Sequence, residues 1–158
     1  MAGIPYERCR TNMTENPIEL RHADTDSAVA ACFLVLSQLR PHLADVSALV
    51  AQIGRQGQEG YRLLAAWRGG KVVGVAGYRL QENLIYGRFV YVDDLAVLDT
   101  ERRGNIGVSL LDAVAAEAKA SGCKQLILDT GLGNALAQRF YFRCGLLMSA
   151  FRFERTLE

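Results

Sequence analysis

The stretch of sequence that decides the fold runs from Tyr91 to Gly107 and reads YVDDLAVLDTERRGNIG. It begins as an apolar strand interrupted by two acids, Asp93 and Asp94, and it ends in a glycine-containing turn that opens an amphipathic helix. The first N–H groups of a helix have no partner inside the helix, and the helix dipole favours negative charge beside them. The turn therefore predicts a site where backbone amides hold the phosphate oxygens of a cofactor.

The residues before this stretch predict strands. Tyr61 to Trp67 and Val72 to Leu80 are apolar runs joined by Arg68-Gly69-Gly70-Lys71, which is typical of a hairpin. Phe89 to Val97 forms the next strand. We therefore expect three neighbouring antiparallel strands.

Two helices are expected between a first strand, Ile18 to His22, and this hairpin. Asp24-Thr25-Asp26 can cap a helix whose apolar spacing continues until Pro41. A shorter helix should follow Asp45. Three glycines then break the pattern and predict a mobile connection: Gly54, Gly57 and Gly60.

The residues after the turn alternate between helix and strand. Apolar positions from Ile106 to Ala118 follow helical spacing, Gln125 to Asp129 is a fifth strand, and Asn134 to Arg143 is a short helix. A last strand is expected from Leu147 to Arg155. The order β-α-α-β-β-β-α-β-α-β predicts an α/β fold in layers, of the α+β kind with a mixed sheet.

Size and charge limit the classes of function. The chain has 158 residues, half of them apolar, which suits one domain over residues 17–158 after a loose N-terminal arm at 1–16. Its net charge of +1 gives no reason to expect nucleic acid or membrane as a partner. The longest apolar run, Ala28 to Leu36, is far shorter than the roughly 20 residues that span a bilayer. A cytoplasmic protein is expected.

The cysteines do not predict a metal site. No C-x-x-C spacing is present and the chain has only two histidines, so zinc is not expected. Free cysteine usually behaves as a small core residue, and a thiol nucleophile is the minor alternative. The cysteines are Cys9, Cys32, Cys123 and Cys144.

Two motifs resemble those of the GNAT superfamily of acetyl-CoA-dependent N-acetyltransferases. The first motif is Arg or Gln, two residues, Gly, any residue, then Gly or Ala, and Arg102, Asn105 and Gly107 hold its specified positions. Asn105 replaces the first glycine, and asparagine tolerates left-handed backbone well, so the loop can keep its shape. The second motif is matched by Asn134, Ala137, Tyr141 and Gly145, with Leu146 where the family has phenylalanine.

The resemblance implies a GNAT-like fold, in which a central, mostly antiparallel sheet of six to seven strands is flanked by about four helices. It also implies transfer of the acetyl group of acetyl-CoA to a primary amine of a small molecule or protein, by direct attack through a tetrahedral intermediate. The resemblance implies no metal ion in this reaction. The diphosphate would bind the amides of Arg102, Arg103, Gly104, Asn105, Ile106, Gly107 and Val108, with Ser109 as a further donor. The pantetheine arm would pair with the backbone of Leu95, Ala96 and Val97 and contact Asn134 and Ala137.

Catalysis needs a proton donor for the thiolate and a base for the amine. A phenol of pKa about 10 can protonate a thiolate whose thiol has a pKa of about 8.5, and Tyr141 is the candidate, with a core aromatic as the alternative. The candidates for the base are Asp94 first, Asp93 second and Asp129 third; the alternative for each is a hydrogen bond to loop backbone only. Strand alternation predicts that Asp93 and Asp94 point to opposite faces.

The acceptor stays open at this point. By resemblance, Arg40, His42 and the segment Gly54 to Gly60 would line its pocket, and the acids Asp93, Asp94, Asp99 and Glu101 faintly favour a cationic amine. Aminoglycosides, amino acids, polyamines and peptides all fit the near-neutral charge. A homodimer is also left open. The second hypothesis is an acyl-CoA sensor without turnover. A Rossmann site is excluded because Gly131 to Leu136 lacks the third glycine.

Overall fold

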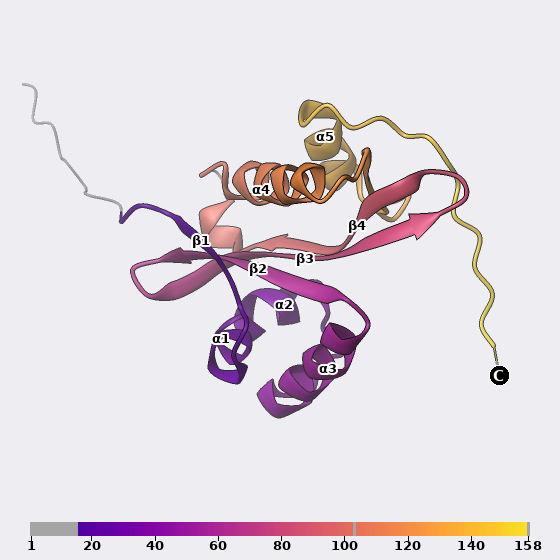
Figure 1. The fold of residues 1–158 in the computed structure, drawn as a ribbon. Helices are drawn as coiled ribbons and strands as arrows, with labels where there is room; N and C mark the ends of the chain where they lie inside the picture. Colours follow the sequence, from indigo (N-terminus) through magenta and orange to yellow (C-terminus); the bar gives the residue numbers. More distant parts are fainter. Residues whose placement is uncertain (1–15, 103, 158) are drawn as a thin grey trace, which may run out of the picture.

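The computed structural model describes residues 16–102 and 104–157, and it places one sheet between two layers of helices (Figure 1). The predicted N-terminal arm lies outside the described residues except for Asn16. The mixed α/β prediction is confirmed by the order of elements: β1 (Glu19–His22), α1 (Asp26–Ala31), α2 (Phe33–Leu39), α3 (Val46–Gln58), β2 (Tyr61–Arg68), β3 (Lys71–Asn83), β4 (Gly87–Val97), the 3-10 turn η1 (Asp99–Glu101), α4 (Ile106–Ala120), β5 (Gln125–Leu128) and α5 (Ala135–Arg143).

The described sheet has five strands in the order β1-β2-β3-β4-β5. Strands β1 to β4 run antiparallel to one another, as predicted for the hairpin and the strand after it, whereas β5 is parallel to β4. The prediction of six to seven strands is too high. The sheet is nevertheless mixed and mostly antiparallel, as expected.

The strand predicted from Leu147 to Arg155 is wrong. This segment has no regular structure within the described residues, and Figure 1 shows it running past the ends of β3 and β4 and away from the sheet. Its side chains are largely exposed; Phe151 is 74% and Phe153 is 93% exposed. Alternating apolar and polar residues indicate only that a segment can be extended with one apolar side. To form a strand, the segment also needs a neighbouring strand edge with which to pair.

The helix break predicted at Gly54 and Gly57 is also wrong. Helix α3 continues through both glycines to Gln58. Its first turn is fixed by Asp45, whose Oδ1 accepts a hydrogen bond from the N–H of Ala48 at 2.8 Å. A glycine inside a helix costs about 0.5–1 kcal/mol relative to alanine, which burial of the apolar face can outweigh. The chain turns only at Gly60, where φ is +87°.

The two faces of the sheet bury separate cores. Helices α1, α2 and α3 cover one face, with Val35, Leu36 and Leu49 against Val75 of β3. Helix α4 covers the other face, where Leu110 and its neighbours pack against the sheet. The start of α4 lies especially close to β3, because a Cβ at Gly74 would be 2.9 Å from Cγ2 of Ile106 and 3.2 Å from the carbonyl oxygen of Ala96. Gly74 thereby lets the start of α4 pack closely on β3, opposite the end of β4.

Candidate active site

Strand β4 contains a β-bulge at Asp93. Gly77 of β3 pairs with Asp94, but the next residue, Tyr78, pairs with Val92, so Asp93 is an extra residue on β4. The bulge reverses the alternation: Val92 and Leu95 both contribute to the core beneath α4. Asp93 and Asp94 both face the other side, where they line one cavity. The prediction that they point to opposite faces is wrong for this reason.

The cavity lies on the α2–α3 side of the sheet and has a volume of about 400 Å³. Arg40 and His42, which were expected to line an acceptor pocket, both lie on it, and Gln56 does so from the segment Gly54 to Gly60. The remaining lining residues are Leu36, Leu43, Leu49, Gln52, Ile53, Tyr61, Tyr91, Asp93, Asp94 and Arg152.

The carboxylate of Asp94 is held from two sides. Tyr61 donates its hydroxyl to Oδ2 at 2.9 Å, Arg40 donates Nε to Oδ1 at 3.0 Å, and Nη2 of Arg40 forms an ion pair with the same oxygen at 2.9 Å. Burial, reinforced by Asp94, raises the pKa of the Tyr61 phenol well above its ordinary value, so this phenol stays a donor. The ring reaches Asp94 by crossing β3 at Gly77, where a Cβ would be only 1.8 Å from the Tyr61 hydroxyl.

Asp93 has a different environment. Its Oδ2 lies 3.3 Å from Nε of Arg79, but both atoms are buried and neither has a hydrogen-bond partner among the described residues. Burial raises the pKa of the Asp93 carboxyl, and the positive charge of Arg79 opposes this only in part. Asp93 thus binds a proton more readily than an ordinary aspartate, and its Oδ2 makes no hydrogen bond within the described residues.

Asp129 lies just past the end of β5 and does not line the cavity. It accepts a hydrogen bond from the Tyr91 hydroxyl and forms an ion pair with Nη1 of Arg152 at 3.1 Å. Burial and the bond to Asp129 raise the pKa of Tyr91 to about 12. Nη2 of Arg152 donates to the same hydroxyl at 3.3 Å. The C-terminal segment reaches the cavity through these contacts.

Each acid that faintly favoured a cationic acceptor is matched by an arginine. Asp93 and Asp94 pair with Arg79 and Arg40 on the cavity, as described. Asp99 pairs with Arg102 at 2.6 Å, and Glu101 pairs with Arg68. The acids therefore create no uncompensated negative field, and they no longer favour a polycationic acceptor.

The start of α4 has the properties of a phosphate site. Asn105 takes up left-handed backbone, with φ of 56° and ψ of 14°, which confirms the expectation for this position. Among the described residues no side chain caps α4, and its first turn holds no acid. Thr25, Asp45 and Asn134 cap α1, α3 and α5, while α2 also lacks a side-chain cap. The first N–H groups of α4 are thus open to an anion, and the residues fit a diphosphate.

The residues expected to bind the diphosphate at the start of α4 differ in their exposure and contacts. Arg103 lies outside the described residues, and Arg102 is engaged by Asp99. Gly104 and Ser109 are exposed, whereas Ile106 is buried. Gly107 and Val108 are half-buried, and a Cβ at Gly107 would be 3.1 Å from Cζ of Phe140, so α5 closely approaches the start of α4.

The half of β4 that follows the bulge has one unpaired edge. Strand β5 pairs with Phe89 to Val92 only, so the edge of Leu95 to Val97 that faces away from β3 has no strand beside it in the described structure. Unpaired strand edges present N–H and C=O groups to any extended chain. A peptide-like arm such as pantetheine fits there.

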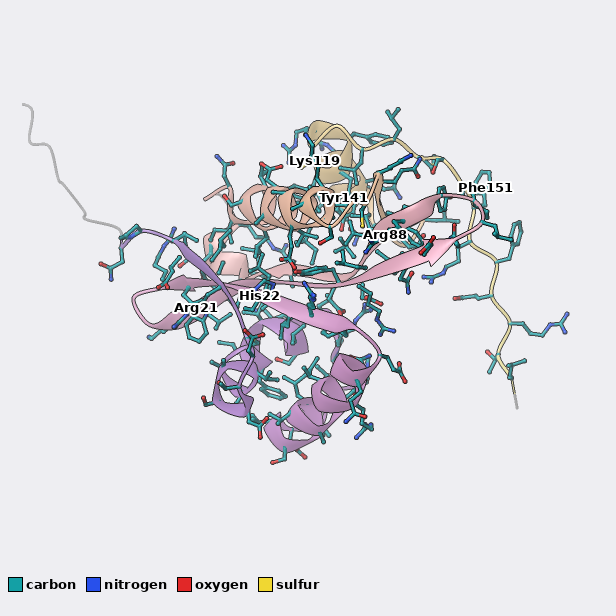
Figure 2. The ribbon with its side chains drawn as sticks, viewed as in Figure 1. Arg21, His22, Arg88, Lys119, Tyr141 and Phe151 are labelled. Atoms are coloured by element: carbon teal, nitrogen blue, oxygen red, sulfur yellow. The ribbon has the colours of Figure 1, made fainter. Side chains whose placement is uncertain are left out.

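Helix α5 supplies the second motif. The Asn134 Oδ1 caps the helix by accepting from the N–H of Ala137 at 3.1 Å, so the spacing of this motif has a structural role. Tyr141 lies on the α4–α5 side of the sheet (Figure 2). Burial, and to a lesser degree Cys144, raises the pKa of its phenol, which keeps it protonated at neutral pH.

Several residues of the site could not be found by local pattern. Tyr61, Arg79, Tyr91 and Arg152 carried no motif, and Gly77 gave no turn signal. They come together because β2, β3, β4 and the C-terminal segment are adjacent only in the folded sheet. The pairing register that connects them cannot be read from a local pattern of residues.

Within residues 16–102 and 104–157 no cluster of three or more histidines, cysteines and acids could hold a metal ion. Cys32 is buried in the core as expected, and burial raises its thiol pKa to about 12, while Cys9 lies outside the described residues. No helix in the described part of the chain is long and apolar enough to cross a bilayer.

Comparison with known proteins agrees with this geometry. Residues 29–146 match the model of the Acetyltransferase (GNAT) family. The chain is 34% identical over 143 residues to the aminoalkylphosphonate N-acetyltransferase of Salmonella typhimurium strain LT2, covering 88% of this chain and 91% of that protein. It is 36% identical to the IAA acetyltransferase of Azospirillum brasilense over 53% of each chain.

Among solved structures, the aminoglycoside acetyltransferase AAC(6')-Iy in complex with a CoA-based bisubstrate analogue has a TM-score of 0.78 at 18% identity, covering 90% of this chain and 99% of that one. At this identity the likeness shows the fold. The family match, the extensive likeness to an N-acetyltransferase and the open start of α4 lead to one conclusion. The chain belongs to the Acetyltransferase (GNAT) family and is an acyltransferase that uses acetyl-CoA as its co-substrate.

Proposed function

We propose that the protein acetylates the primary amine of a small molecule, by direct attack of the amine on the thioester through a tetrahedral intermediate. The bulge at Asp93 carries this proposal. It turns two carboxylates into the cavity, and within the next few residues β4 exposes the edge on which a pantetheine arm can lie. An acceptor in the cavity and the thioester would thus meet along one strand.

The co-substrate would be bound mainly by backbone. The N–H groups from Gly104 to Val108 would hold the diphosphate, with Ser109 as a further donor and Arg102 and Arg103 at the rim. Leu95, Ala96 and Val97 would pair with the pantetheine arm. One N–H of this edge would also stabilise the oxyanion of the intermediate, a contribution worth about 3–4 kcal/mol where comparable donors have been removed. Ala137 and the amide nitrogen of Asn134 would face the arm.

Asp93 is the base that the geometry supports best. Asp94, placed first on sequence, is occupied by Tyr61 and Arg40 on both oxygens. Asp93 keeps a buried oxygen without a hydrogen bond, and its raised pKa makes it the stronger base. We assign Asp94 to positioning Arg40 and Tyr61 at the cavity, and Asp129 to holding Tyr91 and Arg152.

Tyr141 is the proposed acid. Its pKa is raised, so it holds its proton at neutral pH and can give that proton to the departing thiolate. Tyr141→Phe should lower kcat without a matching change in the KM for acetyl-CoA. Unchanged turnover in this variant would remove Tyr141 from the mechanism.

The acceptor is proposed to be a short amine that also carries an acidic group. A cavity of about 400 Å³ suits a small molecule, and acids paired with arginines suit a molecule with both charges. The likeness to an aminoalkylphosphonate N-acetyltransferase supports this class. Detection of free CoA across a panel of amines tests it, and no CoA release with any amine at millimolar concentration would favour the alternative, a sensor without turnover.

The proposal includes three features of organisation: a single domain over residues 17–158, a cytoplasmic location and a homodimer. Exposed apolar side chains of the C-terminal segment support the homodimer, because large apolar side chains gathered on one segment often mark an interface. Sedimentation equilibrium of the purified protein would show a monomer if the last feature is wrong.

A further inference from the structure

The charges around the cavity balance in pairs. Asp93 faces Arg79, Asp94 faces Arg40, and Asp129 faces Arg152. A polycation entering this region would meet as many positive as negative groups. A zwitterion carries one positive and one negative group, and each can lie against an opposite charge of the protein.

The three arginines differ in how many donors they have left. Arg40 donates Nε to Asp94, and its Nη2 forms an ion pair with the same carboxylate and donates to the backbone oxygen of Asp93 at 3.1 Å. Arg79 is 22% exposed, lies 3.3 Å from Asp93 and stacks above the Tyr61 ring at 5.6 Å, but it is not among the residues that line the cavity. Arg40 is thus committed to the protein, and Arg79 lies outside the cavity lining.

Of the two arginines that line the cavity, Arg152 is the less committed. Its side chain is 64% exposed, and it makes one ion pair at 3.1 Å and one longer bond, at 3.3 Å, to the Tyr91 hydroxyl. A guanidinium has five N–H donors in a planar fork that matches an oxyanion, so donors remain for a ligand. The residue lines the cavity, as does His42 from the connection between α2 and α3.

The position of Arg152 favours a short acceptor. Arg152 contacts Tyr91, which precedes Asp93 by two residues on β4, and Arg152, Tyr91 and Asp93 all line one cavity of about 400 Å³. A cavity of this size suits a linker of two or three carbons between an amine at Asp93 and an oxyanion at Arg152.

We propose that Arg152 is the specificity-determining residue of the acceptor site, and that it binds the phosphonate, phosphate or carboxylate of a short amino acid analogue whose amine lies against Asp93. This inference rests on the proposed function and adds the residue that selects the acceptor. It also explains why the C-terminal segment lies at the cavity although it pairs with no strand of the described sheet, since Arg152 brings it there.

The test compares four amines of similar length with acetyl-CoA: 2-aminoethylphosphonate, β-alanine, propylamine and 1,3-diaminopropane. For the wild type we expect higher kcat/KM with the first two. Arg152→Ala should lower kcat/KM for 2-aminoethylphosphonate by about 10- to 100-fold, mainly through KM, as expected for a hydrogen bond to a charged group. The value for propylamine should change less than about twofold, and Arg152→Lys should restore part of the loss.

Arg155→Ala is the matched control, since it removes the same charge from an exposed residue of the same segment and should leave the ratio of the two substrates unchanged. Raising the salt concentration should raise the KM for 2-aminoethylphosphonate in the wild type and much less in Arg152→Ala. A thermal melt of each variant checks folding.

Two results would overturn the inference while leaving the proposed function intact. One is acetylation of propylamine with no preference for the amines that carry an oxyanion. The other is an Arg152→Ala variant that keeps the wild-type ratio between 2-aminoethylphosphonate and propylamine. Failure of the wild type to acetylate any amine would instead refute the proposed function, and the inference with it.

Discussion

Replacing Gly77 with alanine adds only one methyl group, but it should displace the Tyr61 ring and break the hydrogen bond from Tyr61 to Asp94. The added Cβ would lie 1.8 Å from the Tyr61 hydroxyl oxygen, 2.5 Å from Cζ and 2.9 Å from Cε2. Ordinary contact between such atoms is about 3.5 Å, so the ring would have to move by roughly 1.7 Å. The hydrogen bond of 2.9 Å from Tyr61 to Asp94 cannot survive that shift.

The cost can be bounded from the two effects. Overpacking a core by one methyl group costs about 1–3 kcal/mol, and a lost bond to a charged group costs about 1.5–3 kcal/mol. The two overlap, because the ring escapes the clash by giving up the bond. We expect Gly77→Ala to lower the free energy of unfolding by about 2–4 kcal/mol, and the melting temperature by roughly 5–15 °C.

Urea denaturation and a thermal melt measure this effect, and a double-mutant cycle with Tyr61→Leu assigns it. In the Tyr61→Leu background the ring is gone, so Gly77→Ala should cost at least about 1 kcal/mol less than in the wild type. If Gly77→Ala is as stable as the wild type, or costs the same in both backgrounds, then Tyr61 does not cross β3 at this glycine.

Three further predictions concern α3, the base and a polar cluster beside α4. Gly57→Ala, in a helix with open space around the added Cβ, should stabilise the protein by about 0.5–1 kcal/mol in urea denaturation; destabilisation would mean that α3 does not continue through this residue. In the wild type, kcat/KM should fall at acidic pH, with a midpoint above the ordinary aspartate pKa of 3.8 because burial raises the pKa of the Asp93 carboxyl. Asp93→Asn should remove this acidic limb of the pH profile. Asp94→Asn should weaken activity but keep the limb, and the reverse pattern would exchange the two roles. Burial raises the pKa of Glu117, but the Tyr78 hydrogen bond and the charges of His22 and Arg62 outweigh it and leave the pKa below its ordinary 4.5. A carboxyl group whose pKa is lowered by folding contributes its full stabilisation only above the unfolded-state pKa. Glu117→Gln should therefore lower the free energy of unfolding at neutral pH, and the difference in that free energy from the wild type should shrink as the pH falls through the folded pKa. A difference that stays constant with pH would argue against an ionised Glu117.

The parts of the fold that depend on local pattern could be read from the sequence. The Gly69-Gly70 turn and the apolar runs around it predicted the β2–β3 hairpin, and the helical spacing from Ile106 predicted α4. The left-handed Asn105 followed from the motif and from the backbone tolerance of asparagine. These features are decided by residues close together in the chain.

The parts that depend on distant pairing could not be predicted. The bulge at Asp93 exists only in the register between β3 and β4, and strict alternation gave the wrong face for one of the two acids. The C-terminal segment alternates like a strand, yet it pairs with no strand of the described sheet and contacts β4 and the end of β5 through Arg152, at Tyr91 and Asp129. Gly57 is a poor helix residue by itself, but tertiary burial along α3 outweighs that preference.

The most direct test of the central claim is a crystal structure with a bisubstrate analogue in which CoA is joined through its sulfur to 2-aminoethylphosphonate. We expect the diphosphate at the N–H groups of Ile106 to Val108, the sulfur beside the unpaired edge of Leu95 to Val97, and the amine nitrogen in the cavity within hydrogen-bond reach of Asp93. An analogue whose diphosphate binds at α4 but whose amine lies outside the cavity, away from both Asp93 and Asp94, would contradict the claim that the bulge of β4 joins the two substrates.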